Sequence, residues 1–276
     1  MATLTLEDFQ AAQQRISPYV KPTPIVTMTP NGLHLKAENL HPIGAFKLRG
    51  AFNAILSLTP EERARGVVAH SSGNHAQGVA YAARMLNTKA TVVMPDNASK
   101  LKLAATRAWG ADVVQVPVKE RSAKCQELAK AHGYAAIEPY DARPILAGTG
   151  TIALEILSQM PQVKYVTVPI SGGGLLGGVS AAMARAGAGR GIKVYGIEPE
   201  LASDAYQSFK AGRIVALPAE ETGRTIADGL RVAQIGDIPW EHIKEFVHDM
   251  ATVSEEEIRA CVRRVALEAH LVAEIG

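Results

Sequence analysis

Hydrophobic positions near the start of the chain recur at helical spacing. Leu6 to about Ile16 has the pattern of an amphipathic helix, and Thr5 before it is of a type that caps helices. Alternation at 33–38 predicts a strand, and a helix is expected to run on to Leu58. Thr59-Pro60-Glu61-Glu62 is a capping box with proline at the first helical position, so a short helix should follow.

The middle of the chain alternates regularly between short apolar runs and helical segments. Gly110 and Gly133 stand where helices need a residue in the left-handed conformation to end. Short apolar strands of this kind are typically buried on both faces, which predicts a parallel sheet covered by helices. The predicted strands are 67–70, 90–94, 112–116 and 135–137, and the predicted helices are 74–86, 99–109 and 119–131.

A second set of strands and helices follows Pro144. Helices are predicted at 150–158 and 175–186, strands at 165–169 and 194–198, and a last helix from the capping box at Ser254 to His270. We therefore expect an α/β protein with two lobes. A large, discontinuous domain would comprise residues 1–65 and 144–276, and a small domain would comprise residues 66–143.

The composition narrows the class of protein. Hydrophobic residues make up 47% and charged residues 20%, as is ordinary for a globular enzyme. The net charge is +2 and no basic run with interleaved aromatics occurs, so nucleic acid is not expected as a partner. No signal peptide and no long apolar run is present, so no membrane association is expected. Two cysteines are too few for a disulfide framework, and we expect a cytoplasmic protein.

Lys47 lies in a largely apolar stretch, His41-Pro42-Ile43-Gly44-Ala45-Phe46-Lys47-Leu48-Arg49-Gly50. Burial disfavours an ammonium ion and lowers the pKa of a lysine, which makes the amine a nucleophile suited to Schiff-base chemistry with a carbonyl group. Taken alone, the pattern is better explained by a solvated lysine in the first turn of a helix, since most lysines are solvated.

Ser171-Gly172-Gly173-Gly174-Leu175 follows a predicted strand and opens a predicted helix. Backbone N–H groups at such a junction bind phosphate, and we favour an anion site there over a tight turn needed only for packing. Ser71-Ser72-Gly73-Asn74-His75 sits at the same kind of junction. Its hydroxyls, amide and N–H groups suit a carboxylate, whereas a simple helix cap would need only one of them.

Acidic residues gather after the strand that ends near Glu198. Glu198, Glu200 and Asp204 could supply oxygen ligands to Mg²⁺ or Ca²⁺, although a solvated acidic loop is the commoner explanation of such a cluster.

The Gly-Ala-Phe-Lys-Leu-Arg-Gly stretch, the Ser-Ser-Gly-Asn-His loop and the Ser-Gly-Gly-Gly-Leu turn, in this order, resemble the fold type II pyridoxal-phosphate enzymes, and specifically the threonine/serine dehydratase and serine racemase branch. The resemblance extends from Leu6 to Glu274. It implies pyridoxal 5′-phosphate as the cofactor, an amino acid as the substrate and a homodimer as the assembly.

The resemblance also implies a role for each matching residue. Lys47 would carry the cofactor and act as the base on one face of the substrate Cα, with Phe46 packed beside the cofactor ring. Ser72 takes the position of the base on the opposite face in racemases. Asn74 would bind the 3′-oxygen of the cofactor, and Ser71, Asn74 and His75 would hold the substrate carboxylate. The phosphate would bind at Ser171, Gly172, Gly173, Gly174 and Leu175.

Further segments match the family less directly. Ala147-Gly148-Thr149-Gly150-Thr151 and Ala227-Asp228-Gly229 are expected to line the site, and Glu198, Ala202 and Asp204 match the divalent-cation site of this branch. The family continues past the position of Glu274 into a strand and a loop that meets the pyridine nitrogen. We therefore expect the C-terminal part of the fold to be missing here.

The activity expected from the resemblance is α,β-elimination of L-threonine or L-serine to a 2-oxo acid and ammonia. Serine racemase and 3-hydroxyaspartate dehydratase are close alternatives. A non-catalytic phosphate- or nucleotide-binding α/β protein is an alternative of a different class.

Overall fold

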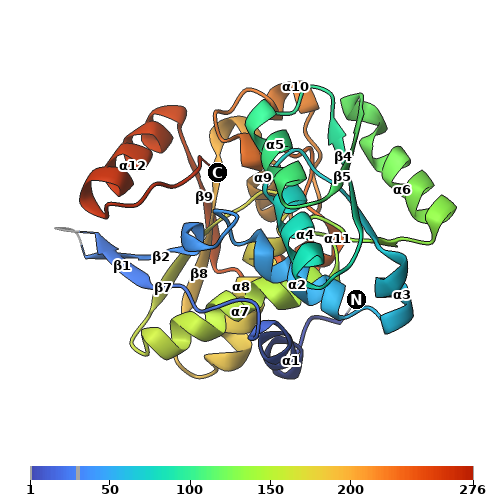
Figure 1. Cartoon of the computed structure of the whole chain (residues 1–276). Coiled ribbons are helices and arrows are strands. Elements are labelled where there is room, and N and C mark those ends of the chain that lie inside the picture. Colours follow the sequence, from blue (N-terminus) through green and yellow to red (C-terminus); the bar gives the residue numbers. More distant parts are fainter. Residues whose placement is uncertain (1, 29–31, 276) are drawn as a thin grey trace.

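The computed structural model describes residues 2–28 and 32–275. Within these ranges the strands form a two-stranded antiparallel hairpin and two parallel sheets, with helices packed around both sheets (Figure 1). The α/β class that the sequence predicts is confirmed.

Capping residues fix where three helices begin, as predicted. Helix α1 (Leu6–Ile16) starts after Thr5, whose side chain accepts a hydrogen bond from the backbone N–H of Asp8. Thr59 and Ser254 form complete capping boxes in front of α3 (Pro60–Arg65) and α12 (Glu255–Glu268). Each box satisfies backbone N–H groups that a helix start would otherwise leave without partners.

The first parallel sheet has the strand order β5-β4-β3-β6. Strands β3 and β4 are buried, as predicted, whereas the edge strand β5 is partly exposed, because only one neighbour covers it. Gly110 and Gly133 both have positive φ at helix ends. The elements are β3 (Val67–His70), α4 (Asn74–Met85), β4 (Ala90–Pro95), α5 (Lys100–Ala108), β5 (Asp112–Val116), η2 (Val118–Glu120), α6 (Arg121–His132) and β6 (Ala135–Ala136).

The second parallel sheet has the order β7-β8-β9 and packs against the central helices α7 and α8. Its elements are α7 (Arg143–Gln159), β7 (Tyr165–Pro169), α8 (Gly174–Ala186), β8 (Lys193–Pro199), η3 (Glu200–Ala202), α9 (Asp204–Ala211), α10 (Ala219–Thr222), η4 (Asp228–Leu230), α11 (Asp237–Phe246) and β9 (Asp249–Val253).

The prediction for the start of α7 was wrong. The sequence predicts a helix from Gly150, but α7 begins at Arg143, seven residues earlier. Its glycines reflect close packing rather than a loop. A Cβ atom at Gly148 would lie 2.6 Å from the carbonyl oxygen of Arg49, and one at Gly150 would lie 2.4 Å from the Phe9 ring.

The segment before Lys47 forms a hairpin and a short helical turn. Strand β1 (Ile25–Met28), which was not predicted, pairs with β2 (Leu33–Lys36), and η1 (Glu38–Leu40) follows. Helix α2 then runs over Lys47–Leu56, so Lys47 is its first residue.

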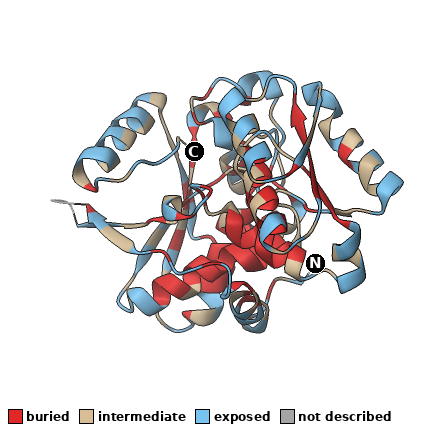
Figure 2. Cartoon of the chain, in the orientation of Figure 1, coloured by how far each residue is buried: buried red, intermediate tan, exposed pale blue. Residues whose placement is uncertain are grey.

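Buried side chains concentrate in the middle of the molecule, along α7, α8, α2 and the strands of the first sheet (Figure 2). One core cluster includes Leu146, Leu176 and Val179, and a second includes Phe52, Val79 and Val92. Helix α12 lies at the periphery without a buried residue. Over residues 2–28 and 32–275, no helix is long and apolar enough to cross a membrane.

Candidate active site

The amine of Lys47 lies inside the protein at the start of α2. Its Nζ donates a hydrogen bond of 2.8 Å to the carbonyl oxygen of Pro139 and lies 5.2 Å from the centroid of the Phe46 ring. Although part of the Lys47 residue is exposed, loss of hydration around the amine lowers its pKa from the ordinary 10.5 to about 8. The geometry therefore favours the nucleophilic amine over the solvated lysine.

Helix α4 packs directly against Lys47. A Cβ atom at Gly78 would lie 3.3 Å from the carbonyl oxygen of Lys47, so glycine allows the two helices to approach closely. His75 on the same helix is buried, and its Nε2 lies 2.9 Å from the carbonyl oxygen of Ile137. Burial, and then the charge of Lys47, lower the pKa of His75 to about 3. The imidazole is therefore neutral, and it contacts the backbone carbonyl of Ile137. His75 can then bind a carboxylate through its backbone N–H group.

The loop between β3 and α4 keeps polar groups available. Gly73 is the N-cap of α4, and no side chain caps this helix. The Ser71 hydroxyl accepts a hydrogen bond of 3.1 Å from the Gly73 N–H. Ser72 is exposed, and its hydroxyl has no hydrogen-bond partner among the described residues. The alternative that Ser72 or Asn74 serves to cap the helix is therefore not supported.

Asn74 binds a carboxylate in this structure. Its Nδ2 donates a hydrogen bond of 2.5 Å to Glu274, whose other carboxylate oxygen pairs with Lys102. The Lys102 ammonium also lies 2.7 Å from Asp228, in the Ala227–Gly229 segment that was expected to line the site. Glu274 and Lys102 were not predicted as site residues, because this contact joins positions 200 residues apart in sequence.

The glycine turn presents backbone N–H groups at the start of α8. Gly173 has φ +88°, a conformation that favours glycine. The first N–H groups of a helix have no intrahelical acceptor. Within the described ranges, no residue accepts a hydrogen bond from the N–H groups of Gly173, Gly174 or Leu175. These N–H groups can therefore bind an anion.

Side chains pack closely against the other side of the same turn. Close packing therefore requires glycine here, in addition to any role of the turn in binding an anion. A Cβ atom at Gly172 would lie 2.4 Å from the Tyr140 ring. The hydroxyl of Thr149 on α7 donates a hydrogen bond of 2.8 Å to the carbonyl oxygen of Gly174. Because Tyr140 follows Pro139, two consecutive residues connect the glycine turn with the amine of Lys47.

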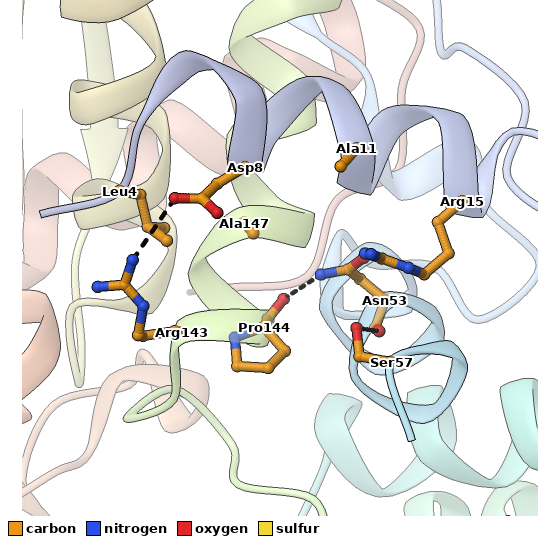
Figure 3. A pocket seen from close by; sticks show the side chains of 9 residues that line it. All are labelled: Leu4, Asp8, Ala11, Arg15, Asn53, Ser57, Arg143, Pro144 and Ala147. Carbon is orange, nitrogen blue, oxygen red and sulfur yellow. Dashed lines mark hydrogen bonds and ion pairs between the residues drawn. The ribbon is translucent and has the colours of Figure 1, made fainter. Parts of the chain in front are cut away.

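A cavity of about 260 Å³ adjoins the carbonyl partner of Lys47. It lies where the segment after β6 meets the segment before α11, and its lining includes Pro139, Tyr140 and Ile235. A second hollow, of about 170 Å³, lies between α1, α2 and the start of α7 (Figure 3). Of the residues that the sequence predicts for the site, its lining includes Ala147 alone.

Glu198 at the end of β8 and Asp204 at the start of α9 are buried, so the explanation of a solvated loop is wrong for these two residues. The Glu198 carboxylate accepts hydrogen bonds from the N–H groups of Ala205 and Tyr206 at 3.3 and 2.8 Å. Burial and the charge of Asp204 raise the pKa of Glu198 to about 9, and burial raises that of Asp204 to about 7. Ala202 is also buried, whereas Glu200 is exposed. No group of three or more His, Cys, Asp or Glu side chains able to hold a metal occurs in the described part of the chain.

Comparisons with known proteins identify the family to which the chain belongs. Residues 16–275 match the family model described as "Pyridoxal-phosphate dependent enzyme". The L-threo-3-hydroxyaspartate ammonia-lyase of Saccharomyces cerevisiae is 40% identical, over 99% of this chain and 85% of that protein. The L-threonine ammonia-lyase of Thermotoga maritima is 38% identical, over 98% of this chain and 68% of that protein. The crystal structure of serine racemase from Dictyostelium discoideum superposes with a TM-score of 0.91 at 35% identity, and covers 99% of this chain and 88% of that one.

Proposed function

Because the chain belongs to the family of pyridoxal-phosphate-dependent enzymes, we propose that it is an ammonia-lyase that converts L-threonine or L-serine to a 2-oxo acid and ammonia. The observation that carries the proposal is the Lys47 amine. It lies away from water, its pKa is lowered to about 8, and among the described residues its hydrogen-bond partner is a carbonyl oxygen rather than a carboxylate. Such an amine reacts with an aldehyde without first losing a strong ion pair.

The residues present fit the cofactor. An aldehyde group would react with Lys47, and the phosphate would bind the N–H groups from Ser171 to Leu175 at the positive end of α8. Phe46, beside the amine, would pack against the ring, and Asn74 would bind the ring oxygen. When bound, pyridoxal phosphate supplies an electron sink for the charge that develops when the Cα proton of an amino acid is removed.

The chain's own groups then orient the substrate and move protons. Ser71, Asn74 and the N–H group of His75 would hold the substrate carboxylate at the positive end of α4, where Asn74 already bonds to a carboxylate oxygen of Glu274. Lys47 would remove the Cα proton from one face. Loss of the β-hydroxyl as water gives an enamine, and the addition of water then releases the 2-oxo acid and ammonia.

A serine racemase activity is the second candidate function. The Ser72 hydroxyl supports it, because this hydroxyl is exposed in the substrate loop and has no hydrogen-bond partner in the described part of the chain. A proton acceptor on the face opposite Lys47 is what racemisation requires. The relative from Saccharomyces cerevisiae, named as a hydroxyaspartate lyase, keeps 3-hydroxyaspartate as a further candidate substrate.

Three broader features belong to the same proposal. Glu198 and Asp204, together with the backbone carbonyl of Ala202, would bind Mg²⁺ or another divalent cation, because neither buried carboxylate pairs with a basic side chain in the ranges that the structure covers.

Residues 66–143 would move as a small domain against residues 1–65 and 144–276. The active assembly would be a homodimer.

A substrate panel tests the proposed activity. We expect ammonia and a 2-oxo acid in equal amounts from L-threonine or L-serine in the presence of pyridoxal phosphate, and neither product with the Lys47→Ala variant. D-serine and the isomers of 3-hydroxyaspartate complete the panel. If none of these amino acids yields ammonia, the lyase assignment is wrong.

A further inference from the structure

Arg49 has the largest of the fully buried side chains in the described protein, with 1% of its surface exposed. It lies two residues after Lys47 in the first turn of α2. A guanidinium group away from water is costly unless carboxylates surround it with hydrogen bonds. The groups that bind the Arg49 guanidinium therefore show which segments of the chain it connects.

Two carboxylates bind Arg49, each through two hydrogen bonds. Its Nε and Nη2 donate to Glu38 at 2.7 and 2.8 Å, and its Nη1 and Nη2 donate to Glu155 at 2.6 and 3.0 Å. Although burial would raise the pKa of Glu38, hydrogen bonds from His41 and Arg49 hold it at about 2. The ion pair between Glu38 and Arg49 is therefore intact across the range of pH in which enzymes work.

The two partners of Arg49 come from different parts of the chain. Glu38 is in η1, before the loop that leads into α2, and Glu155 is on α7, in the centre of the molecule. The pair between Glu38 and Arg49 therefore closes the chain from residue 38 to residue 49 into a loop, and Glu155 fixes that loop to α7. No side chain caps α2, and its first turn contains no acidic residue, so the usual means of fixing a helix start are absent.

We propose that Arg49 is a positioning residue for Lys47. Its paired hydrogen bonds to Glu38 and Glu155 hold the first turn of α2 so that Lys47 Nζ stays in its poorly hydrated position against the carbonyl oxygen of Pro139. The inference deepens the proposed function and rests on it, since it concerns how the reactive amine is kept in place.

The Arg49→Lys variant tests this role, because lysine keeps the charge and loses the planar fork of donors. The measurement is the pH dependence of Lys47 labelling by pyridoxal phosphate, trapped with borohydride and located by peptide mass. In the wild type we expect a midpoint near 8. In Arg49→Lys we expect the midpoint to rise by about one unit toward the ordinary lysine value, and the affinity for pyridoxal phosphate to fall about tenfold. His75 faces Lys47 from α4 and stays neutral above pH 3, so it does not titrate in this window.

The Arg15→Lys variant is the matched control. Arg15 donates a hydrogen bond to Asn53 (Figure 3), which lies in a later turn of α2 than Lys47. This variant should keep the wild-type midpoint and affinity even if its melting temperature falls. If Arg49→Lys is less stable but keeps both wild-type values, Arg49 only stabilises the fold and the inference is wrong.

The Glu38→Gln variant decides the question if Arg49→Lys does not fold. It keeps the pair between Arg49 and Glu155 and weakens the contacts that Glu38 makes with Arg49, His41 and Thr23. The inference predicts the same upward shift of the midpoint, and an unchanged midpoint contradicts it. A wild-type protein that is never labelled at Lys47 would remove the proposed function and this inference together. If the wild-type protein is labelled at Lys47 and the variants keep its midpoint and affinity, only the inference is wrong.

Discussion

At Lys47 the chemistry depends on how much water surrounds one amine. Loss of hydration alone accounts for a pKa near 8, since no basic side chain contributes to the shift. The Pro139 carbonyl satisfies one N–H of the amine without stabilising the ammonium ion as a carboxylate would. This arrangement keeps the amine available to an aldehyde near neutral pH.

Ser72 separates elimination from racemisation. Removal of its hydroxyl in Ser72→Ala should abolish interconversion of L- and D-serine and leave elimination from the L-isomer comparatively intact. Stability should change little, because the hydroxyl caps nothing in the structure. Both rates are measured in one preparation, with Ser71→Ala as the comparison. A ratio of the two rates that matches the wild type would remove Ser72 from the list of catalytic residues.

His75 should make the fold sensitive to acid. Its pKa is 6.5 in the unfolded chain and about 3 in the fold, so the unfolded chain binds the extra proton between these values. The stability that depends on neutral His75 is therefore complete above pH 6.5 and is lost as the pH falls toward 3, by up to roughly 5 kcal/mol. Urea unfolding at several pH values should show a shallower loss in His75→Gln. The exposed His132→Gln variant should keep the wild-type slope; equal slopes in all three proteins would contradict the burial argument.

The sequence marks the chemically distinctive residues of the proposed site and does not mark those that depend on tertiary contacts. Lys47, the serine-rich loop and the glycine turn are recognisable because their residue types are costly without a function. Pro139 contributes a backbone carbonyl, which no sequence pattern marks. Glu274 reaches Asn74 only through the complete fold.

In the helices and turns of this chain, glycine has two different structural roles. At Gly173 it permits a positive φ, whereas at Gly148 it permits two helices to touch. The sequence predicted α1 and strands β3, β5 and β7 with their observed bounds, because caps and apolar runs mark them locally. It placed the start of α7 wrongly, because close helix packing and a loop both select glycine.

Gly148→Ala should therefore destabilise the protein although alanine is the better helix former. The added methyl group would lie 2.6 Å from the Arg49 carbonyl oxygen, and such overpacking typically costs about 1–3 kcal/mol. Gly177→Ala is the control on α8, where the nearest atoms would be at 3.4 Å, and it should be neutral or slightly stabilising. Urea unfolding of both variants measures the difference. Equal free energies of unfolding would mean that the helices separate at little cost.

Across the whole molecule, polar contacts connect parts of the chain that the hydrophobic core clusters do not connect. Lys102 on α5 pairs with Asp228 and with Glu274, and Asn74 on α4 also bonds to Glu274. These contacts connect the first sheet's helices with the last part of the chain at the substrate loop. The sequence could not predict them, because surface charges of this kind occur throughout the chain and only the fold selects the pairs.

A divalent cation bound at Glu198 and Asp204 should stabilise the whole fold. A ligand that binds only the folded state raises the free energy of unfolding, so chelation should lower the melting temperature and Mg²⁺ should restore it. Asp204→Asn should lose this response, whereas the exposed Glu200→Gln should keep it. A melting curve indifferent to chelator and Mg²⁺ would leave the two carboxylates as a buried, proton-binding pair.

Covalent labelling of Lys47 tests the account most directly. The protein mixed with pyridoxal phosphate should gain visible absorbance, and borohydride should then fix one pyridoxyl group per chain on the peptide that contains Lys47. Lys47→Ala should show neither signal while its melting curve remains cooperative. A folded wild-type protein that stays colourless, or a label that falls on other lysines and persists in Lys47→Ala, would contradict the assignment of Lys47 as the reactive amine.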